Sequence, residues 1–259
     1  MDLKLQDRLA FVSASTAGIG LTIAGALARE GARVIVNGRT PVTVAAAVER
    51  LRAQTGIEVL GFAGDMTTAR DAEALADRFP DVEILVANLG VVEARPFEDI
   101  PDADWLNVFE ANVLSSVRLA RLYLPTMRAA HFGRIIFISS ASALQLPRTI
   151  HDDITKSAQI ALARGLAAAV AGTGVTVNCV LAGPTRARGV EDVVQALKGE
   201  GEGFEAFETV FVKDARPPSP INQGATSEEV ASLVAYVASP IASATTGAAL
   251  RVDSGVAAI

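Results

Sequence analysis

The sequence has few of the residues that build disulfides and metal sites. Cys179 is the only cysteine among 259 residues, and His131 and His151 are the only histidines. No intrachain disulfide can form, and a metal site would need ligands other than cysteine, so we predict none. A single cysteine also fits a reducing compartment, and we expect a cytoplasmic protein.

The chain also lacks an excess of positive charge and a run typical of a membrane span. Its 23 Lys and Arg against 29 Asp and Glu give a formal net charge of −6, which predicts no nucleic-acid partner. The uncharged run from Gly165 to Gly183 is interrupted by Thr173, Gly174 and Asn178, as in a helix end, a turn and a strand. The stretch MDLKLQDRLAFVSAS does not suit a signal peptide. We therefore expect no membrane partner.

Short apolar runs alternate with longer helical segments along the whole chain, and the 50% hydrophobic content excludes disorder. The runs predict seven strands: Leu9–Ser13, Arg33–Asn37, Glu58–Phe62, Ile84–Ala87, Arg134–Ser139, Val175–Val180 and Ala248–Val252. The segments between them predict helices at Gly18–Glu30, Pro41–Gln54, Thr68–Phe79, Asp102–Ala130, Ile154–Ala171 and Ser227–Ala238. This order predicts one α/β domain over residues 1–259, a doubly wound parallel sheet of the Rossmann type with helices on both faces.

One long segment, residues 185–224, breaks this alternation. It contains Arg-Ala-Arg, Gly-Glu-Gly-Glu-Gly and Pro-Pro-Ser-Pro. A stretch of this length inside a compact domain is typical of a lid, and we expect it to cover a small-molecule substrate. Phe204, Phe207 and Phe211 either form an apolar wall of the lid or pack it onto the core.

A glycine-containing turn lies between the first predicted strand and the first predicted helix. Residues 13–20 read Ser-Ala-Ser-Thr-Ala-Gly-Ile-Gly. Glycines there let the backbone approach a pyrophosphate, and the helix N-terminus offers free N–H groups to it. The alternative is a tight turn without a ligand. We predict a dinucleotide site that includes Ser13, Ser15, Thr16, Gly18, Ile19 and Gly20.

With four further motifs in order, the chain resembles the short-chain dehydrogenase/reductase family, and in particular its 3-oxoacyl-(acyl carrier protein) reductase-like members. The family's Thr-Gly-x-x-x-Gly-x-Gly loop corresponds to residues 13–20, and its Asn-Asn-Ala-Gly corresponds to Ala-Asn-Leu-Gly at residues 87–90. Asn112 matches its helix asparagine, Ser139 and Ser140 its Ser-Ser pair, and Gly183 its Pro-Gly. The resemblance implies a homotetramer or dimer and adds Asn88, Gly90, Gly183 and Thr185 to the cofactor contacts.

The end of the second strand indicates which nucleotide binds. NAD sites place an acid there for the ribose 2′-hydroxyl, whereas an arginine accommodates a 2′-phosphate. The sequence has no acid at this point and one arginine, Arg39, so NADP(H) is favoured over NAD(H). Alternatively, Arg39 is a solvated residue. Asp65, with Met66 beside it, resembles the family's adenine-contacting aspartate, although it could instead cap the helix that follows.

The family's catalytic tyrosine is absent. Lys156 fits the family's lysine, but four residues before it the chain has Asp152. The neighbours of Asp152 are His151 and Asp153, and neither is a tyrosine. Ala14, Ala87, Ala182 and Ser254 are milder departures from the family pattern.

This replacement changes the available chemistry. A free tyrosine titrates near ~10 and an aspartate near ~3.9, and a lysine nearby favours the ionised carboxylate further. An ionised Asp152 cannot donate the proton that carbonyl reduction needs, although it could act as a base or share a proton with Asp153. His151 is a candidate substitute acid or a residue packed at a helix start.

The serine position is ambiguous as well. The strand pattern favours Ser140 as the residue that binds the substrate oxygen, whereas the family's usual interval gives Ser139. In an extended chain Ser142 would face the same side as Ser140.

We therefore predict an NADP(H)-dependent oxidoreductase acting on a carbonyl or alcohol, with Asn112, Ser140, Asp152 and Lys156 as its catalytic set. Two alternatives stay open. One is a non-redox enzyme on the same scaffold with Asp152 as base. The other is a nucleotide-binding protein without turnover, since fold alone does not separate these functions.

Overall fold

The computed structural model describes residues 1–92, 95–144, 150–186 and 219–257. A seven-stranded sheet in the order β3-β2-β1-β4-β5-β6-β9 runs through its centre, and every pairing in it is parallel. This confirms the predicted Rossmann-type sheet. The strands are β1 Leu9–Val12, β2 Arg33–Gly38, β3 Val59–Ala63, β4 Ile84–Ala87, β5 Gly133–Ser140, β6 Val175–Ala182 and β9 Ala249–Val252.

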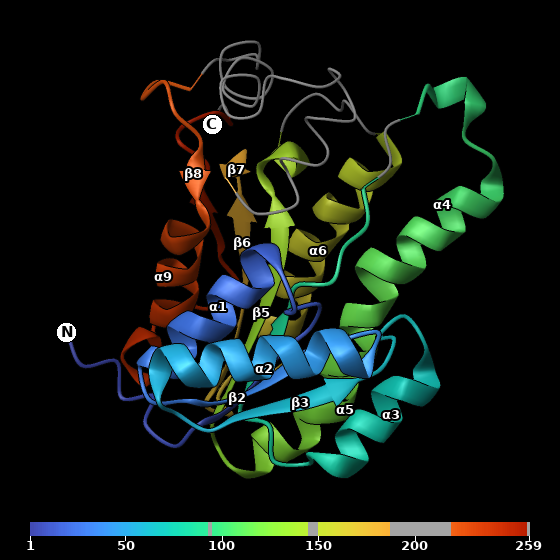
Figure 1. The fold of residues 1–259 in the computed structure, drawn as a ribbon. Helices are drawn as coiled ribbons and strands as arrows, with labels where there is room; N and C mark the ends of the chain where they lie inside the picture. The colour runs from blue at the N-terminus through green and yellow to red at the C-terminus, as the bar shows by residue number, and fades with distance from the viewer. Residues whose placement is uncertain (93–94, 145–149, 187–218, 258–259) are drawn as a thin grey trace.

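Helices cover both faces of the sheet (Figure 1), and each layer buries its own apolar core. One layer contains α1 Gly18–Arg29, α2 Pro41–Thr55 and α9 Ser227–Ala238. The other contains α3 Ala69–Arg78, α5 Ser115–Ala129 and α6 Ile150–Ala169. The five inner strands, β2, β1, β4, β5 and β6, are buried on both sides, which explains why they read as continuous apolar runs. The edge strands β3 and β9 are partly exposed.

Two helix caps follow the sequence signals. The Thr40 side chain accepts a hydrogen bond from the Thr43 N–H at the start of α2, where Pro41 is the first helical residue. Thr226 and Glu229 form a capping box at the start of α9. Such caps satisfy backbone N–H groups that have no partner within the helix, which is why the boundaries were predictable.

The predicted single helix Asp102–Ala130 is wrong in one respect. It consists of α4 Asp102–Phe109, a π-helical turn η2 Glu110–Leu114, and α5. Asn112 lies in the π turn, and its side chain pairs with the backbone of Val91, accepting from the N–H at 2.8 Å and donating to the carbonyl at 3.1 Å. The wider turn is the kind of local insertion that often occurs at functional sites.

The helix that carries Lys156 starts earlier than predicted. It begins at Ile150 rather than Ile154, so Asp152 and Asp153 lie in its first turn. Acidic residues are favourable there because the helix dipole is positive at its N-terminus.

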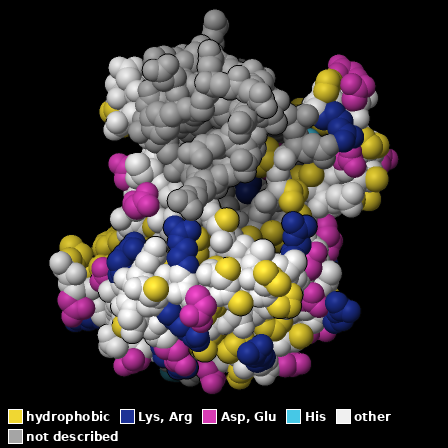
Figure 2. All heavy atoms as spheres, in the orientation of Figure 1, with side chains coloured by type: hydrophobic (Ala, Val, Ile, Leu, Met, Phe, Trp, Pro, Cys, Tyr) yellow, Lys and Arg dark blue, Asp and Glu magenta, His cyan; other side chains and the backbone are white. Residues whose placement is uncertain are grey.

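Two short strands, β7 Thr185–Arg186 and β8 Ala225–Thr226, pair near the ends of the predicted lid segment. Residues 187–218, with Phe204, Phe207 and Phe211, lie outside the described residues. Within the described part, no helix is both long and apolar enough to cross a bilayer. Acidic and basic side chains are interspersed over the visible face (Figure 2).

Candidate active site

The candidate site lies at the carboxyl ends of the strands, where the sheet order reverses between β1 and β4. Such a switch point opens a crevice for ligands. The Ser13 hydroxyl at the end of β1 accepts hydrogen bonds from the N–H groups of Asn88 and Leu89, both at 2.9 Å. The Asn88 amide donates back to the carbonyls of Ser13 and Ala14 at 3.1 Å. Ser13 and Asn88 therefore fix the glycine loop to the neighbouring strand.

The N-terminus of α1 is arranged to receive an anion. Ala17 occupies the N-cap without a side-chain hydrogen bond, and the first turn has no acidic residue. Gly18 has φ +57°, a left-handed conformation that favours glycine. A Cβ on Gly20 would lie 2.5 Å from the Ala14 carbonyl oxygen and from the Asn88 amide nitrogen. These residues fit a pyrophosphate, which needs uncapped N–H groups and a close backbone approach.

A cavity of about 330 Å³ extends from this loop across the ends of β2, β3 and β4. Five of the predicted cofactor residues line it: Thr16, Arg39, Asp65, Met66 and Gly90. Asn37 also lines the cavity, but its side chain is already hydrogen-bonded to the protein backbone. Its Oδ1 accepts from the Ala14 N–H at 3.0 Å, and its amide donates to the carbonyls of Phe62 and Gly64. Arg39 is therefore the charged side chain that the end of β2 contributes to the cavity.

Ser15, Ile19 and Asp65 also have contacts within the protein. The Ser15 hydroxyl points inward, donating to the Val12 carbonyl at 2.6 Å and accepting from the Asn37 N–H at 2.9 Å. Ile19 packs against the core. Asp65 accepts hydrogen bonds from the N–H and the hydroxyl of Thr67, while α3 itself is capped by Thr68.

Residues after β4 and β6 form the other end of the site. A Cβ on Gly90 would lie 2.9 Å from the Lys156 ammonium nitrogen, so α6 brings this cation against the cavity wall. The Gly183 N–H donates to the Val252 carbonyl at 2.9 Å, and the Thr185 hydroxyl donates to the Gly183 carbonyl at 2.8 Å. These two bonds hold the turn after β6 in place.

A buried polar cluster joins the π turn to α6. The Asn112 amide donates to Asp152 Oδ1 and to Thr155 Oγ1, both at 2.9 Å. The Thr155 hydroxyl donates to the Asp152 carbonyl at 2.6 Å, so it must accept from Asn112. The Gln159 amide donates to the Asn112 carbonyl at 2.8 Å. The cluster fixes the position of the Asp152 carboxylate.

Burial opposes the charge of both ionisable groups in this cluster. Asp152 is 3% exposed and Lys156 is 7% exposed. Burial raises the pKa of Asp152, and the nearby Asp153 raises it further, whereas Lys156 and the Asn112 hydrogen bond oppose this shift. Burial lowers the pKa of Lys156, and Asp152 is the main group that opposes that change. Each group therefore helps to keep the other charged.

The two adjacent serines have different surroundings. The Ser139 hydroxyl is buried and donates to the Lys156 carbonyl at 3.0 Å. The Ser140 hydroxyl is partly exposed at the end of β5 and accepts from the Ser142 N–H at 3.1 Å. Residues 141–144 form a 3-10 turn, so the extended chain on which the expectation for Ser142 depended is not present.

The remaining acid candidates lie apart from the cluster or inside the core. His151 is buried at the start of α6, where its ring meets Trp105 edge-on at 5.8 Å between centroids. Tyr123 is buried in α5, and burial raises its pKa. Tyr236 lies on α9. Neither tyrosine is hydrogen-bonded to the Asn112–Asp152 cluster.

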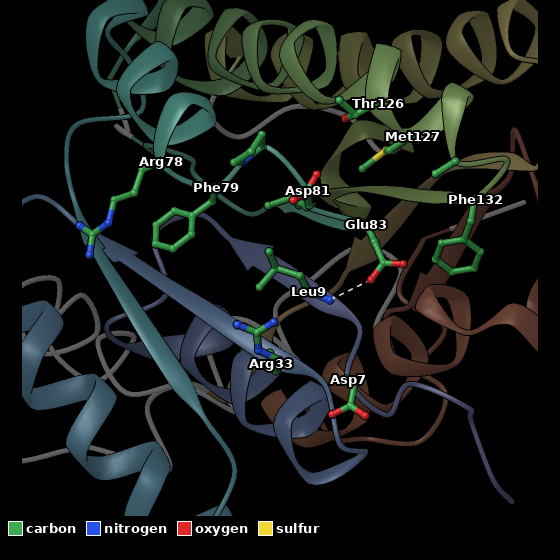
Figure 3. Close-up of a pocket in the computed structure, with 13 residues that line it drawn as sticks. Asp7, Leu9, Arg33, Arg78, Phe79, Asp81, Glu83, Thr126, Met127 and Phe132 are labelled. Carbon is green, nitrogen blue, oxygen red and sulfur yellow. Dashed lines mark hydrogen bonds between the residues drawn. The ribbon is translucent and has the colours of Figure 1, made fainter.

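A larger cavity of about 450 Å³ lies at the opposite edge of the sheet (Figure 3). Leu9, Arg33 and Phe132 line it at the amino ends of β1, β2 and β5. Glu83 accepts the Leu9 N–H at 3.1 Å in its wall. This cavity shares no residue with the cofactor cavity, and ligands of open α/β sheets bind at the other edge.

Comparison with known proteins identifies the family. The family model described as enoyl-(acyl carrier protein) reductase matches residues 13–257. The Bacillus subtilis (strain 168) protein called "Uncharacterized oxidoreductase YvaG" is 42% identical over 259 residues, which cover 99% of this chain and 98% of that protein. The chain belongs to the short-chain dehydrogenase/reductase family.

Solved structures agree with this assignment. This short-chain dehydrogenase/reductase superposes on L-sorbose reductase from Gluconobacter frateurii, complexed with NADPH and L-sorbose, with a TM-score of 0.92, 29% identity and full coverage of both chains. A variant of actinorhodin polyketide ketoreductase with NADPH gives a TM-score of 0.88 at 30% identity, covering 98% of each chain. The predicted family and fold are confirmed.

Sequence reasoning missed two residues that organise the site of this short-chain dehydrogenase/reductase. Asn37 ties the glycine loop to β2 and β3, and a lone asparagine ending an apolar strand was the available signal. Thr155 joins Asn112 to the backbone of α6. Its place next to Lys156 gave no comparable signal, because the partner that it meets is 43 residues away along the chain.

Proposed function

We propose that this chain is an NADP(H)-dependent oxidoreductase that acts on a small molecule. The observation that carries the proposal is a cavity that begins at an uncapped helix N-terminus and contains Arg39, with Lys156 against Gly90 and Asn112 bonded to Val91 in its wall. Asn112 in turn holds Asp152. A cavity that spans the ends of β2, β3 and β4, with the Lys156 cation beside Gly90, suits a dinucleotide better than a single phosphate. The family membership supports redox chemistry at this place.

Residues of this chain are suited to bind each part of NADP(H). The first turn of α1, with Gly18 and Gly20, would hold the pyrophosphate, and Asp65 with Met66 would border the adenine. Arg39 would meet a 2′-phosphate through charge-assisted hydrogen bonds. Lys156 and the turn at Gly183 and Thr185 would hold the nicotinamide end. The cofactor supplies a hydride when it is bound, and the protein orients the substrate and controls protons.

Preference for NADP(H) rests on the end of β2. No carboxylate from this strand reaches the cavity, and the Asn37 amide is already hydrogen-bonded to Ala14, Phe62 and Gly64. A carboxylate there would repel a 2′-phosphate, whereas the Arg39 guanidinium attracts it. The structural relatives crystallised with NADPH support the same choice.

In the same proposal, Ser140 binds the polar end of the substrate and Asp152 occupies the place of the family's tyrosine. Ser140 suits this role better than Ser139 because its hydroxyl is less buried and is not bonded to the backbone of α6. Asp152 sits one helical turn before Lys156, held by Asn112. Residues 185–224 act as the lid, and the protein works in the cytoplasm as a homotetramer or dimer.

Titration calorimetry with NADPH and NADH, followed by assays of cofactor turnover on carbonyl and alcohol panels, tests this function. We expect tighter binding of NADPH and turnover that changes the cofactor's redox state. Turnover without any change in the cofactor would support the non-redox alternative with Asp152 as base. Tight binding without turnover on broad panels would support a nucleotide-binding protein.

A further inference from the structure

The Asp152 carboxylate has one engaged oxygen and one open oxygen. Its Oδ1 accepts the bond from Asn112, whereas Oδ2 accepts no hydrogen bond from any residue that the structure describes. Among the described residues, no Lys or Arg forms a contact ion pair with the Asp152 carboxylate. Lys156 affects its pKa through a longer-range electrostatic interaction. A polar atom on a side chain that is 3% exposed normally has a partner. Oδ2 is not among the fully buried unpaired atoms of the described residues, so it is open to a donor from water or from a ligand.

Burial has the largest effect on Asp152 and raises its pKa, and Oδ2 is an acceptor in the ionised form that the neighbouring charges favour. Lys156 and His151, on the same helix, favour the ionised carboxylate, and so does the amide of Asn112 on the π turn. Asp153 and burial act in the opposite direction. The Lys156 ammonium lies against Gly90, which lines the predicted cofactor cavity. Its position assigns this cation to the cofactor side of the site.

A carbonyl substrate does not match an ionised carboxylate. A carbonyl oxygen only accepts hydrogen bonds, so it would present lone pairs to the lone pairs of Oδ2. A protonated imine presents an N–H donor and a positive charge instead. Hydrogen bonds between a cationic N–H group and a carboxylate are roughly twice as strong as neutral ones.

We propose, as an inference that rests on the NADP(H)-dependent redox function above, that the substrate couple of this site is a protonated imine and its amine. The imine N–H donates to Oδ2 of Asp152, and Asn112 is the positioning residue that holds the carboxylate. The substrate class is thus defined by a carbon–nitrogen rather than a carbon–oxygen double bond.

The redox step balances without a catalytic acid. The imine nitrogen takes one proton from solvent before the step. The imine carbon then gains a hydride with its electron pair, NADPH being the reductant that becomes NADP⁺. The π electrons of the C=N bond become the lone pair of the nitrogen, which keeps its proton. The released amine takes a second proton from solvent.

Alcohol oxidation is the competing chemistry at this oxygen. An alcohol O–H can also donate to Oδ2, but its proton has to pass to the carboxylate as the hydride leaves. A carboxylate is a weak base for an alcohol, whereas the imine couple requires only that it stabilise a cation. We therefore expect imines to exceed carbonyls and alcohols of the same size.

The activity test uses substrates matched in size, 2-methyl-1-pyrroline and 2-methylcyclopentanone, with NADPH. We expect kcat/KM for the imine to exceed that for the ketone by at least about tenfold, which is less than the roughly 10²- to 10³-fold that one electrostatic contact in an active site contributes. Asp152→Asn keeps the size and the acceptor for Asn112 but removes the charge, and should lose about tenfold or more on the imine alone. Asp152→Tyr should reverse the preference toward the ketone.

A binding test that involves no turnover uses the protein without cofactor. 2-Methylpyrrolidinium is titrated by calorimetry, with cyclopentanol as a neutral probe of the same ring size. We expect Asp152→Asn to weaken binding of the ammonium by about tenfold or more and to leave cyclopentanol unchanged. Asp77→Asn, which removes an exposed carboxylate on α3, is the control and should change neither.

The outcomes separate this inference from the redox function. Ketone or alcohol turnover without imine turnover, together with ammonium binding that Asp152→Asn leaves unchanged, would overturn the imine couple while the redox function stands. Ammonium binding that depends on Asp152, in a protein that turns over neither couple with NADPH, would overturn the redox function and with it the imine couple.

Discussion

Asp152 and Lys156 are buried charges, and folding moves both away from water. Burial raises the pKa of the first and lowers that of the second, so each charge works against the stability of the fold. Their hydrogen bonds and mutual attraction offset only part of this cost. Residues held at such a cost are typical of functional sites.

The stability of Asp152→Asn should depend on pH. The folded pKa of Asp152 lies above its unfolded value, so its stabilising contribution is complete below the unfolded pKa and is lost as the pH rises through the folded pKa. We expect the variant to exceed the wild type in Tm at about pH 8 and to lose that advantage by about pH 3. Thermal unfolding of both proteins across this pH range measures the difference in Tm. A difference that grows toward acidic pH would contradict a raised pKa of Asp152.

Arg39→Ala should remove most of the preference for NADPH and leave NADH affinity nearly unchanged. Hydrogen bonds to a charged group contribute about 1.5–3 kcal/mol, so NADPH affinity should fall by roughly 10- to 150-fold. The control is Arg33→Ala, which removes an arginine at the other end of β2, where it pairs with Glu58. Equal affinity of the wild type for both cofactors in calorimetry would show that the interpretation of Arg39 is wrong.

At the scale of elements, the sequence predicted the strands well because the five inner strands are buried on both faces and few polar residues interrupt them. The strand Ile84–Ala87, for example, has the same bounds in the prediction and in the structure. The helix that begins at Asp102 was harder to predict, because the π turn changes the spacing of apolar residues too little to show in the sequence. The early start of α6 was missed because Asp152 and Asp153 read as loop residues, although they suit a helix N-terminus.

The glycine loop itself is testable through Gly18→Val. A β-branched residue is strained at φ +57° and would occupy space at the N-terminus of α1. We expect loss of nucleotide binding by calorimetry with a folded protein by circular dichroism.

The control for this variant is Gly165→Ala on α6, where nothing lies within 4 Å of the added Cβ. It should raise stability by about 0.5–1 kcal/mol and keep cofactor affinity. Unchanged affinity in Gly18→Val would remove the glycine loop from the site.

At the scale of the whole molecule, the cavity lined by five predicted cofactor residues lies at the carboxyl ends of the strands, and the larger cavity of Figure 3 lies at their amino ends. The sequence could place residues at strand ends, but it could not show which side chains the fold uses internally. Ser15 and Ser139 are examples, because their hydroxyls bond to the backbone.

The proposed homotetramer or dimer should depend on exposed apolar side chains of α4 and α6. Leu106 is 70% exposed and Ile154 is 49% exposed. Leu106→Asp should lower the mass measured by light scattering without unfolding the chain. Val42→Asp, at a position 79% exposed on α2, is the control and should leave the assembly intact. A monomeric wild type would contradict the proposal.

Transfer of deuterium from the cofactor to the substrate shows whether this site carries out redox chemistry. The protein is incubated with NADPH deuterated at the transferred position and with the matched imine and ketone, and the products are analysed by mass spectrometry. We expect one deuterium on the carbon that was doubly bonded, with the imine product formed faster than the ketone product. Product formation without deuterium would contradict the claim that this site, with Lys156 and Asp152 beside the cofactor cavity, carries out redox chemistry.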